Sequence, residues 1–337
     1  MEEKLLLVKK MINESLNIPN DIKGFVLAIC KGYIKHSNGM ISLRGIENVC
    51  KTKFVRIEEG DKNFATENNI FGETTRKIFD DGSLVHTMSY VNVNSKVKLV
   101  IILLHELGHI ITEYKVNTVL ENGGFPFLKS TLSFYTNLKY IDDELKCSSS
   151  KGIRINDGFL ETICGSIFSD LTFREEIKLA GCDLGDYVYK DNRLFPSRVY
   201  DEFRDCFQLF NEIMNGKLFE FACMDKDSDE EYINFINKNR IHTIFGFIDK
   251  TLESLWKLKK YENNERDSQF DLLLSEYFKN KNELLMVADI LTDGVNNKDR
   301  VTYLRSVFAN MRKFGNSLPF SESELAFFDE NKPYYGK

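Results

Sequence analysis

The first part of the chain carries apolar positions at helical spacing. Between Met1 and about Thr52 they recur every three or four residues, as at Ile22, Phe25 and Ile29. Side chains at this spacing line one face of a helix. The pattern predicts two or three helices, joined by a turn at Asn38-Gly39.

Between Ile70 and Val93 the period changes to two. The runs IFGETTRKIF and SLVHTMSYVNV alternate apolar and polar residues on either side of an Asp-Asp-Gly sequence. Alternation places successive side chains on opposite faces of a strand, and Asp-Gly favours the tight turn of a hairpin. We therefore expect a β-hairpin with its turn at Asp81-Gly82.

A strongly apolar helix is expected next. Asn94-Ser95 offer an N-cap, and helical periodicity then runs from Val97 to Tyr114. The apolar positions of this segment are Val100, Leu103, Leu104, Leu107 and Ile111. Their spread around the helix predicts that it is seated in the core of the protein.

The rest of the chain is expected to be mostly helical after one irregular stretch. Residues 121–151 contain Gly123-Gly124, Pro126 and a run of serines, which favour a long, partly irregular excursion. A helix follows over 156–172, and from about residue 197 onward the pattern is helical almost throughout. We predict a helical N-terminal segment over 1–60, a core domain over 61–192 and an α-helical lobe over 193–337.

Composition and charge exclude several classes of protein. A net charge of −6 argues against nucleic acid as a partner. The seven cysteines are scattered and never spaced CxxC, so they indicate neither a disulfide framework nor a cysteine zinc site, and a reducing cytoplasm fits best. No signal sequence is visible, and the most apolar run, Leu99 to Leu104, is too short to cross a membrane. We expect a cytoplasmic protein without a membrane partner.

The apolar helix contains the sequence His105-Glu106-Leu107-Gly108-His109. Residues four apart lie on the same face of a helix, one turn from each other, so His105 and His109 can share one metal ion. Glu106 is rotated from His105 by about 100° and can reach the remaining coordination position without occupying it. A carboxylate there can take a proton from a zinc-bound water, whose pKa the metal lowers to about 7.

This HExxH helix resembles the signature of the zincin metallopeptidases. A catalytic zinc needs a third protein ligand from another element. In the gluzincin branch that ligand is a glutamate on a later helix, often within Asn-Glu-Gly followed by apolar residues. The segment that begins at Asn156 reads Asn-Asp-Gly-Phe and is similar to that pattern, with Asp157 in place of glutamate.

Two assignments of the third ligand are open. In one, Asp157 binds the metal and Glu161, one turn later, hydrogen-bonds a ligand histidine, as related enzymes place an acid four residues after the ligand. In the other, the shorter Asp157 does not reach and Glu161 binds the ion.

The resemblance implies an α+β, zincin-like fold: a small sheet packed on the HExxH helix, a second helix with the third ligand, and a mostly α-helical C-terminal lobe. It implies zinc as cofactor and hydrolysis of a peptide or protein substrate, with Glu106 as general base. An alternative is a binding or regulatory protein that keeps the zincin scaffold with weak or no peptidase activity.

Several further residues are candidates for lesser roles. His242, Tyr187 and Tyr189 are alternatives for the group that stabilises the oxyanion. His86 reads as a packed or hydrogen-bonded strand residue, and Cys164 as a small buried hydrophobe. His36 lies beside a turn and is expected to be a solvated surface residue.

Overall fold

We describe the protein from a computed structural model of the whole chain. The residues described are 1–58, 72–78, 84–93, 95–113, 118–119, 127–130, 132–141, 144–185, 203–204, 207–208, 211, 216–224, 246, 249–250, 253–254, 257–258, 267–277 and 279–280. The fold is a mixed α+β fold. One compact unit comprises residues 1–150, 159–197 and 217–229, and the other comprises residues 151–158, 198–216 and 230–337.

Three helices form the N-terminal part of the first unit, as the periodicity predicts. They are α1 (Glu2–Glu14), α2 (Lys23–His36) and α3 (Leu43–Lys51). The predicted turn at Asn38-Gly39 is confirmed: the two residues have φ angles of 52° and 75°. This left-handed conformation is one that glycine and asparagine adopt most readily.

The predicted hairpin is confirmed and belongs to a three-stranded sheet. Strands β2 (Gly72–Ile78) and β3 (Leu84–Asn92) pair antiparallel, with Ile78 opposite Leu84 and Gly72 opposite Tyr90. The turn at 81–82 lies outside the described residues. A strand that the sequence did not reveal, β1 (Lys53–Glu58), pairs parallel to β3, so that the strand order is β1-β3-β2.

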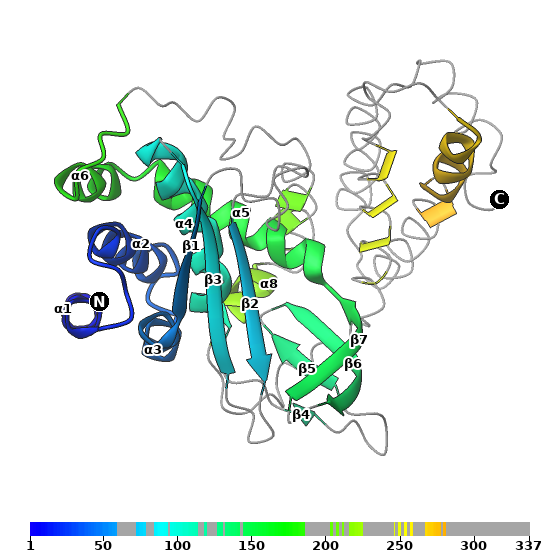
Figure 1. Cartoon of the computed structure of the whole chain (residues 1–337), viewed down its shortest axis with the longest axis horizontal. Helices are drawn as coiled ribbons and strands as arrows, with labels where there is room; N and C mark the ends of the chain where they lie inside the picture. The colour runs from blue at the N-terminus through cyan, green and yellow to red at the C-terminus, as the bar shows by residue number, and fades with distance from the viewer. Residues whose placement is uncertain are drawn as a thin grey trace, which may run out of the picture. The chain divides into compact units, whose positions relative to one another are not determined.

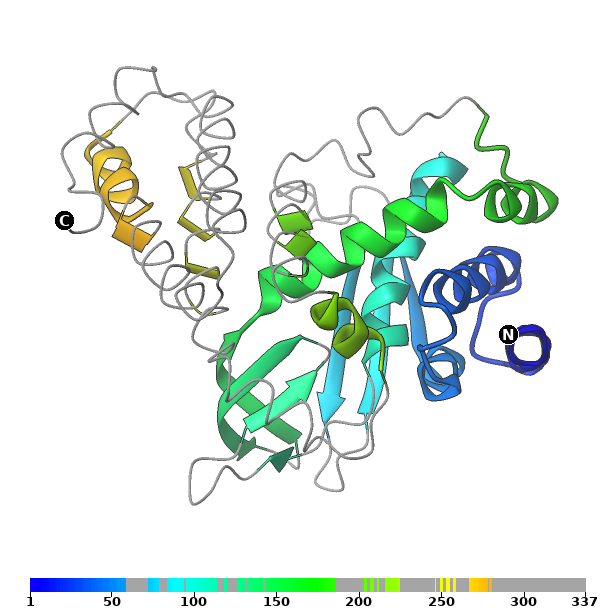
Figure 2. The ribbon, with the colours of Figure 1, turned by 180° about the vertical axis from the view of Figure 1, so that it is seen from behind.

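The predicted apolar helix is α4 (Lys96–Thr112), and its N-cap is Ser95, whose side chain accepts a hydrogen bond from the amide of Lys98. It contacts β2, β3, α2 and α3. Figures 1 and 2 show α4 against one face of the three-stranded sheet. On the α3 side the backbones touch, because a Cβ on Gly45 would lie 2.0 Å from the carbonyl oxygen of Ile111.

The expectation of an irregular excursion over 121–151 is wrong for much of that stretch. It contributes to a second sheet of order β4-β5-β6-β7, formed by β4 (Thr118–Val119), β5 (Phe127–Ser130), β6 (Ser133–Ile141) and β7 (Glu144–Lys151). The glycines, the proline and the serine run favour a loop in the sequence, whereas the alternating apolar residues of 133–141 favour the strand that the structure shows. Serine is compatible with a strand when a neighbouring strand supplies the backbone hydrogen bonds.

The predicted second helix is confirmed as α5 (Ile153–Phe168), which begins earlier and ends earlier than expected. A new helix, α6 (Leu171–Leu179), follows at once, because the side chain of Asp170 accepts a hydrogen bond from the amide of Thr172 and acts as its N-cap. In Figures 1 and 2, α5 crosses α4 on the side turned away from the three-stranded sheet.

Beyond α6 the described residues are mostly helical, as expected. They include α8 (Lys217–Cys223) and a helical run over 268–277. The boundary expected between 192 and 193 lies outside the described part of the chain. The division between the two units falls within α5, after Gly158. No helix among the described residues is long and apolar enough to span a membrane.

Candidate metal centre

His105 and His109 lie one turn apart on α4, as the helical spacing predicts. Their ring centroids are 5.1 Å apart, with ring planes inclined at 76°. His105 is buried, with 4% of its surface exposed, and His109 is partly exposed. The apolar residues around them in α4 are buried, so the helix that carries both rings is anchored in the core.

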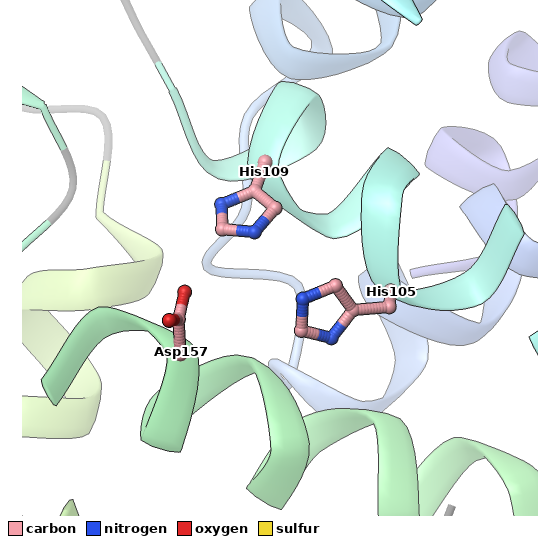
Figure 3. Close-up of side chains that lie close together, drawn as sticks. All are labelled: His105, His109 and Asp157. Carbon is pink, nitrogen blue, oxygen red and sulfur yellow. The ribbon is translucent and has the colours of Figure 1, made fainter. Parts of the chain in front are cut away.

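Asp157 on α5 completes a group of three side chains. One ligand atom from each of His105, His109 and Asp157 can be chosen so that all lie within 4.8 Å of one another. Figure 3 shows the two imidazoles and the carboxylate directed toward a common space. Because α5 is one continuous helix, Asp157 is placed by the same element that carries Glu161.

Glu161 is hydrogen-bonded to His105 and is not one of the three side chains that face the common space. Its Oε1 lies 3.0 Å from Nδ1 of His105, and both side chains are buried. A carboxylate that accepts the Nδ1 proton leaves Nε2 with its lone pair, which is the form of histidine that binds metals. Glu161 therefore selects the tautomer and the ring orientation of His105.

His109 is kept neutral by its surroundings. Burial, together with the neighbouring His105, lowers the pKa of His109 to about 3. Burial disfavours the charged imidazolium because it removes the ion from water. At neutral pH this imidazole is uncharged and available as a ligand.

Glu106 is held against the edge strand β2 of the three-stranded sheet. The hydroxyl of Thr74 donates to Oε2 of Glu106 at 2.9 Å. A Cβ on Gly72 would lie 2.8 Å from Cγ of Glu106, so the glycine makes room for the carboxylate. Burial raises the pKa of Glu106, and the neighbouring His105 and the Thr74 hydrogen bond oppose that rise. A raised carboxylate pKa brings the group closer to the range of a general base.

The glycine inside the motif has a steric role that the sequence analysis missed. A Cβ on Gly108 would lie 2.0 Å from Oη of Tyr33 and 2.9 Å from Cδ2 of Leu160. The Tyr33 hydroxyl donates to the carbonyl oxygen of Leu104 at 3.0 Å and also contacts Sγ of Cys164. Helix α2 therefore packs on the motif where α4 has no side chain. The only sequence signal was a large aromatic residue within an apolar helix face.

The donor set fits a zinc ion. Two imidazole nitrogens and one carboxylate oxygen form a common catalytic zinc set, which leaves a fourth position open. Ligand atoms about 2.0 to 2.1 Å from a tetrahedral zinc lie about 3.3 Å from each other. The ligand atoms of His105, His109 and Asp157 lie within 4.8 Å of one another, so a bound zinc would draw them closer together.

His86 is a hydrogen-bonded strand residue, as predicted. It is buried, and its Nε2 lies 2.7 Å from Oε2 of Glu113, which follows directly after α4. The other carboxylate oxygen of Glu113 pairs with Arg76 of β2 at 2.6 Å. This network ties the end of α4 to both strands of the hairpin.

The other candidates have different outcomes. Cys164 is fully buried, as predicted. Tyr187, Tyr189 and His242 lie outside the described residues, so their proposed roles stay predictions. The expectation for His36 is wrong, because its Nε2 lies 3.0 Å from Oδ2 of Asp170 and the side chain is partly buried.

Asp170 also accepts a hydrogen bond from Lys35 at 2.6 Å. Partial burial acts to raise the pKa of Asp170, but the hydrogen bonds from Lys35 and His36 outweigh it and hold the pKa well below its usual range. This cluster joins α2 to the N-terminus of α6.

No protein-family model, no curated protein and no solved structure matches this chain. Its function is therefore inferred from the geometry of its own residues.

Proposed function

We propose that this chain is a zinc-dependent metallopeptidase with a zincin-like catalytic core. The observation that carries the proposal is the convergence of His105, His109 and Asp157 from two buried helices, with a hydrogen-bonded carboxylate behind His105. A ligand histidine whose other ring nitrogen is hydrogen-bonded to a carboxylate is typical of a functional metal site.

Of the two assignments of the third ligand, the contacts favour Asp157. Its carboxylate is within 4.8 Å of the ligand atoms of both histidines, whereas Glu161 is engaged with the Nδ1 atom of His105. We therefore assign His105, His109 and Asp157 as ligands and Glu161 as the residue that orients His105.

Zinc, when bound, polarises the substrate carbonyl and lowers the pKa of a coordinated water to about 7. Thr74 holds Oε2 of Glu106, so we assign Oε1 as the atom that takes a proton from the attacking water. Glu106 then returns that proton to the leaving amine. Its raised pKa supports this role, because the carboxyl group must hold the proton between the two transfers.

The arrangement of the elements supports the zincin-like core. Helix α4 packs on the three-stranded sheet, and β2, one of the two edge strands of that sheet, contacts Glu106 through Thr74. A peptide or protein substrate and a cytoplasmic location remain part of the proposal.

The test separates metal binding from chemistry. Metal content is measured by mass spectrometry on wild type, His109→Ala and Glu106→Gln, and each is assayed on unfolded protein and a peptide library. We expect about one zinc per chain in wild type and Glu106→Gln, and none in His109→Ala. Hydrolysis should fall by a factor of about 10² to 10⁴ in Glu106→Gln, the usual contribution of a general base.

Glu176→Gln is a matched control, because Glu176 is a glutamate on α6 that pairs with Lys31. It should keep both zinc and activity. Full hydrolysis by zinc-loaded Glu106→Gln would reject the mechanism. Zinc binding by a wild type that hydrolyses nothing would favour a scaffold with a binding role.

A further inference from the structure

The first turn of α5, which leads to Asp157, is capped by a residue from a distant part of the chain. The amides of Gly152 and Arg154 both donate to the carboxylate of Asp249, the second at 3.1 Å. The first amides of a helix have no partner within the helix, and they are usually satisfied by a side chain next to it in sequence. Here the acceptor lies 95 residues beyond Arg154.

The second turn of α5, which contains Asp157 and Gly158, is in contact with residues near Phe203. A Cβ on Gly158 would lie 2.0 Å from the carbonyl oxygen of Phe203 and 2.9 Å from Cβ of Phe207. The guanidinium carbon of Arg154 lies 5.4 Å from the centroid of the Phe203 ring. Arg154 also faces Asp157, with the nearest atoms 3.8 Å apart. Asp157 is thus preceded and followed by residues in close contact with later parts of the chain.

Asp249 is itself anchored through its neighbour Lys250. The buried hydroxyl of Ser254 donates to the carbonyl oxygen of Lys250 at 2.8 Å. The side-chain amide of Asn280 donates to that hydroxyl at 2.8 Å. A chain of hydrogen bonds therefore runs from residue 280 to the segment that caps α5.

We infer that Asp249 is a positioning residue for the metal centre, because it fixes the first turn of α5 and through it the carboxylate of Asp157. This inference rests on the proposed function. A helix end without its cap frays over about one turn, and Asp157 lies within reach of that fraying. Glu161 is one turn deeper, so its bond to His105 is expected to survive.

The measurement is zinc affinity by competition with a chromogenic chelator, at pH 7.5 on the full chain. Burial raises the pKa of Asp249 to about 6, so the carboxylate is charged at this pH. We expect Asp249→Ala to bind zinc at least about tenfold more weakly, the range found when outer residues of a metal site are removed. Asp249→Asn keeps one acceptor oxygen and should bind more tightly than Asp249→Ala.

Asp267→Ala is the matched control. Oδ1 of Asp267 accepts hydrogen bonds from the amides of Gln269 and Phe270 at 3.0 and 3.1 Å, so it caps a helix that carries no proposed ligand. Losing this cap should affect stability to a similar degree, but zinc affinity should not change. The visible spectrum of the cobalt(II)-substituted protein gives a second readout, because it reports on the ligands themselves. It should change in Asp249→Ala and not in Asp267→Ala.

Gly158→Ala is a separate perturbation of the turn that contains Asp157, and folding of each variant is checked by far-UV circular dichroism. It displaces that turn and is expected to weaken zinc binding and alter the cobalt spectrum as well. Wild-type affinity and an unchanged spectrum in folded Asp249→Ala, or in Asp249→Asn if Asp249→Ala does not fold, would overturn the inference. Failure of the proposed function would look different, because wild type itself would then bind no zinc.

Discussion

The contact between Gly108 and Tyr33 supports a quantitative prediction about the motif helix. In Gly108→Ala the new methyl group would lie 2.0 Å from Oη of Tyr33, well inside any normal contact distance. Tyr33 is fully buried, and its hydroxyl is bonded to the carbonyl oxygen of Leu104, so the ring has little freedom to withdraw. The two helices must separate locally, or the tyrosine must leave its site.

The magnitude follows from two opposing effects. Overpacking a well-packed core costs about 1–3 kcal/mol, and this overlap belongs at the upper end. Replacing glycine by alanine within a helix contributes about 1 kcal/mol in the favourable direction. We expect Gly108→Ala to lower the free energy of unfolding by about 2 kcal/mol and to weaken zinc binding, since both histidines flank the displaced residue.

Tyr33→Phe tests the cause directly, because it removes only the oxygen that the methyl group would strike. Alone it loses the hydrogen bond to Leu104, at a cost of about 0.5–1.5 kcal/mol. In the double variant the closest overlap is relieved while the 2.9 Å contact with Cδ2 of Leu160 stays, so the combined loss should be smaller than the sum of the single losses by about 1 kcal/mol. Urea unfolding of the four proteins measures this coupling.

The outcome that would refute this reasoning is additivity. If the two losses simply add, the methyl group does not meet the Tyr33 hydroxyl and α2 does not pack on the motif in this way. A Gly108→Ala protein more stable than wild type would have the same meaning, because only the gain in helix propensity would then be present.

Three further predictions concern charge and metal. Glu113→Gln removes the negative charge that both Arg76 and His86 contact, and should cost about 3 kcal/mol in urea unfolding, since removing the charge of a buried ion pair is strongly destabilising; a loss below about 1 kcal/mol would contradict it. Asp170 has a folded-state pKa below the unfolded value of about 3.9, so its stabilising contribution is present above that pH and lost as the pH falls further. Asp170→Asn, which keeps an N-cap, should therefore lower the melting temperature at pH 7 but progressively less below pH 4, whereas a constant difference would mean that the bond from Lys35 does not act through charge. At a free zinc concentration a thousand times Kd, bound zinc should stabilise the protein by about 4 kcal/mol, and a chelator should remove this gain. The measurement is the melting temperature with and without zinc, and no shift would exclude a metal site.

Local patterns were sufficient where one short segment decides the structure. The helix that carries His105 and His109 follows from the spacing of its apolar residues and from the Ser95 cap. The two histidines are four residues apart, so helix geometry places them on the same face. The hairpin partners β2 and β3 were visible for the same reason, since the strands are adjacent in sequence and alternate in polarity.

The sheets were less predictable because strand pairing is not local. Strand β1 pairs with β3 in parallel, and no turn between them marks that pairing in the sequence. Strands β5 to β7 were hidden because the glycines and proline before β5 and the serine run in β7 favour loops when each segment is considered alone. In the sheet, the neighbouring strands supply the backbone hydrogen bonds.

By itself the sequence determined the residue types at the site: two imidazoles and a carboxylate on one helix, and two acids one turn apart on another. Only the tertiary structure decided their arrangement, with Asp157 beside the histidines and Glu161 on Nδ1 of His105. The same holds for Tyr33 on Gly108 and for Asp249 at the start of α5. The reason is physical: a helix sets the spacing of its own side chains, but which side chains meet across two elements depends on how those elements pack.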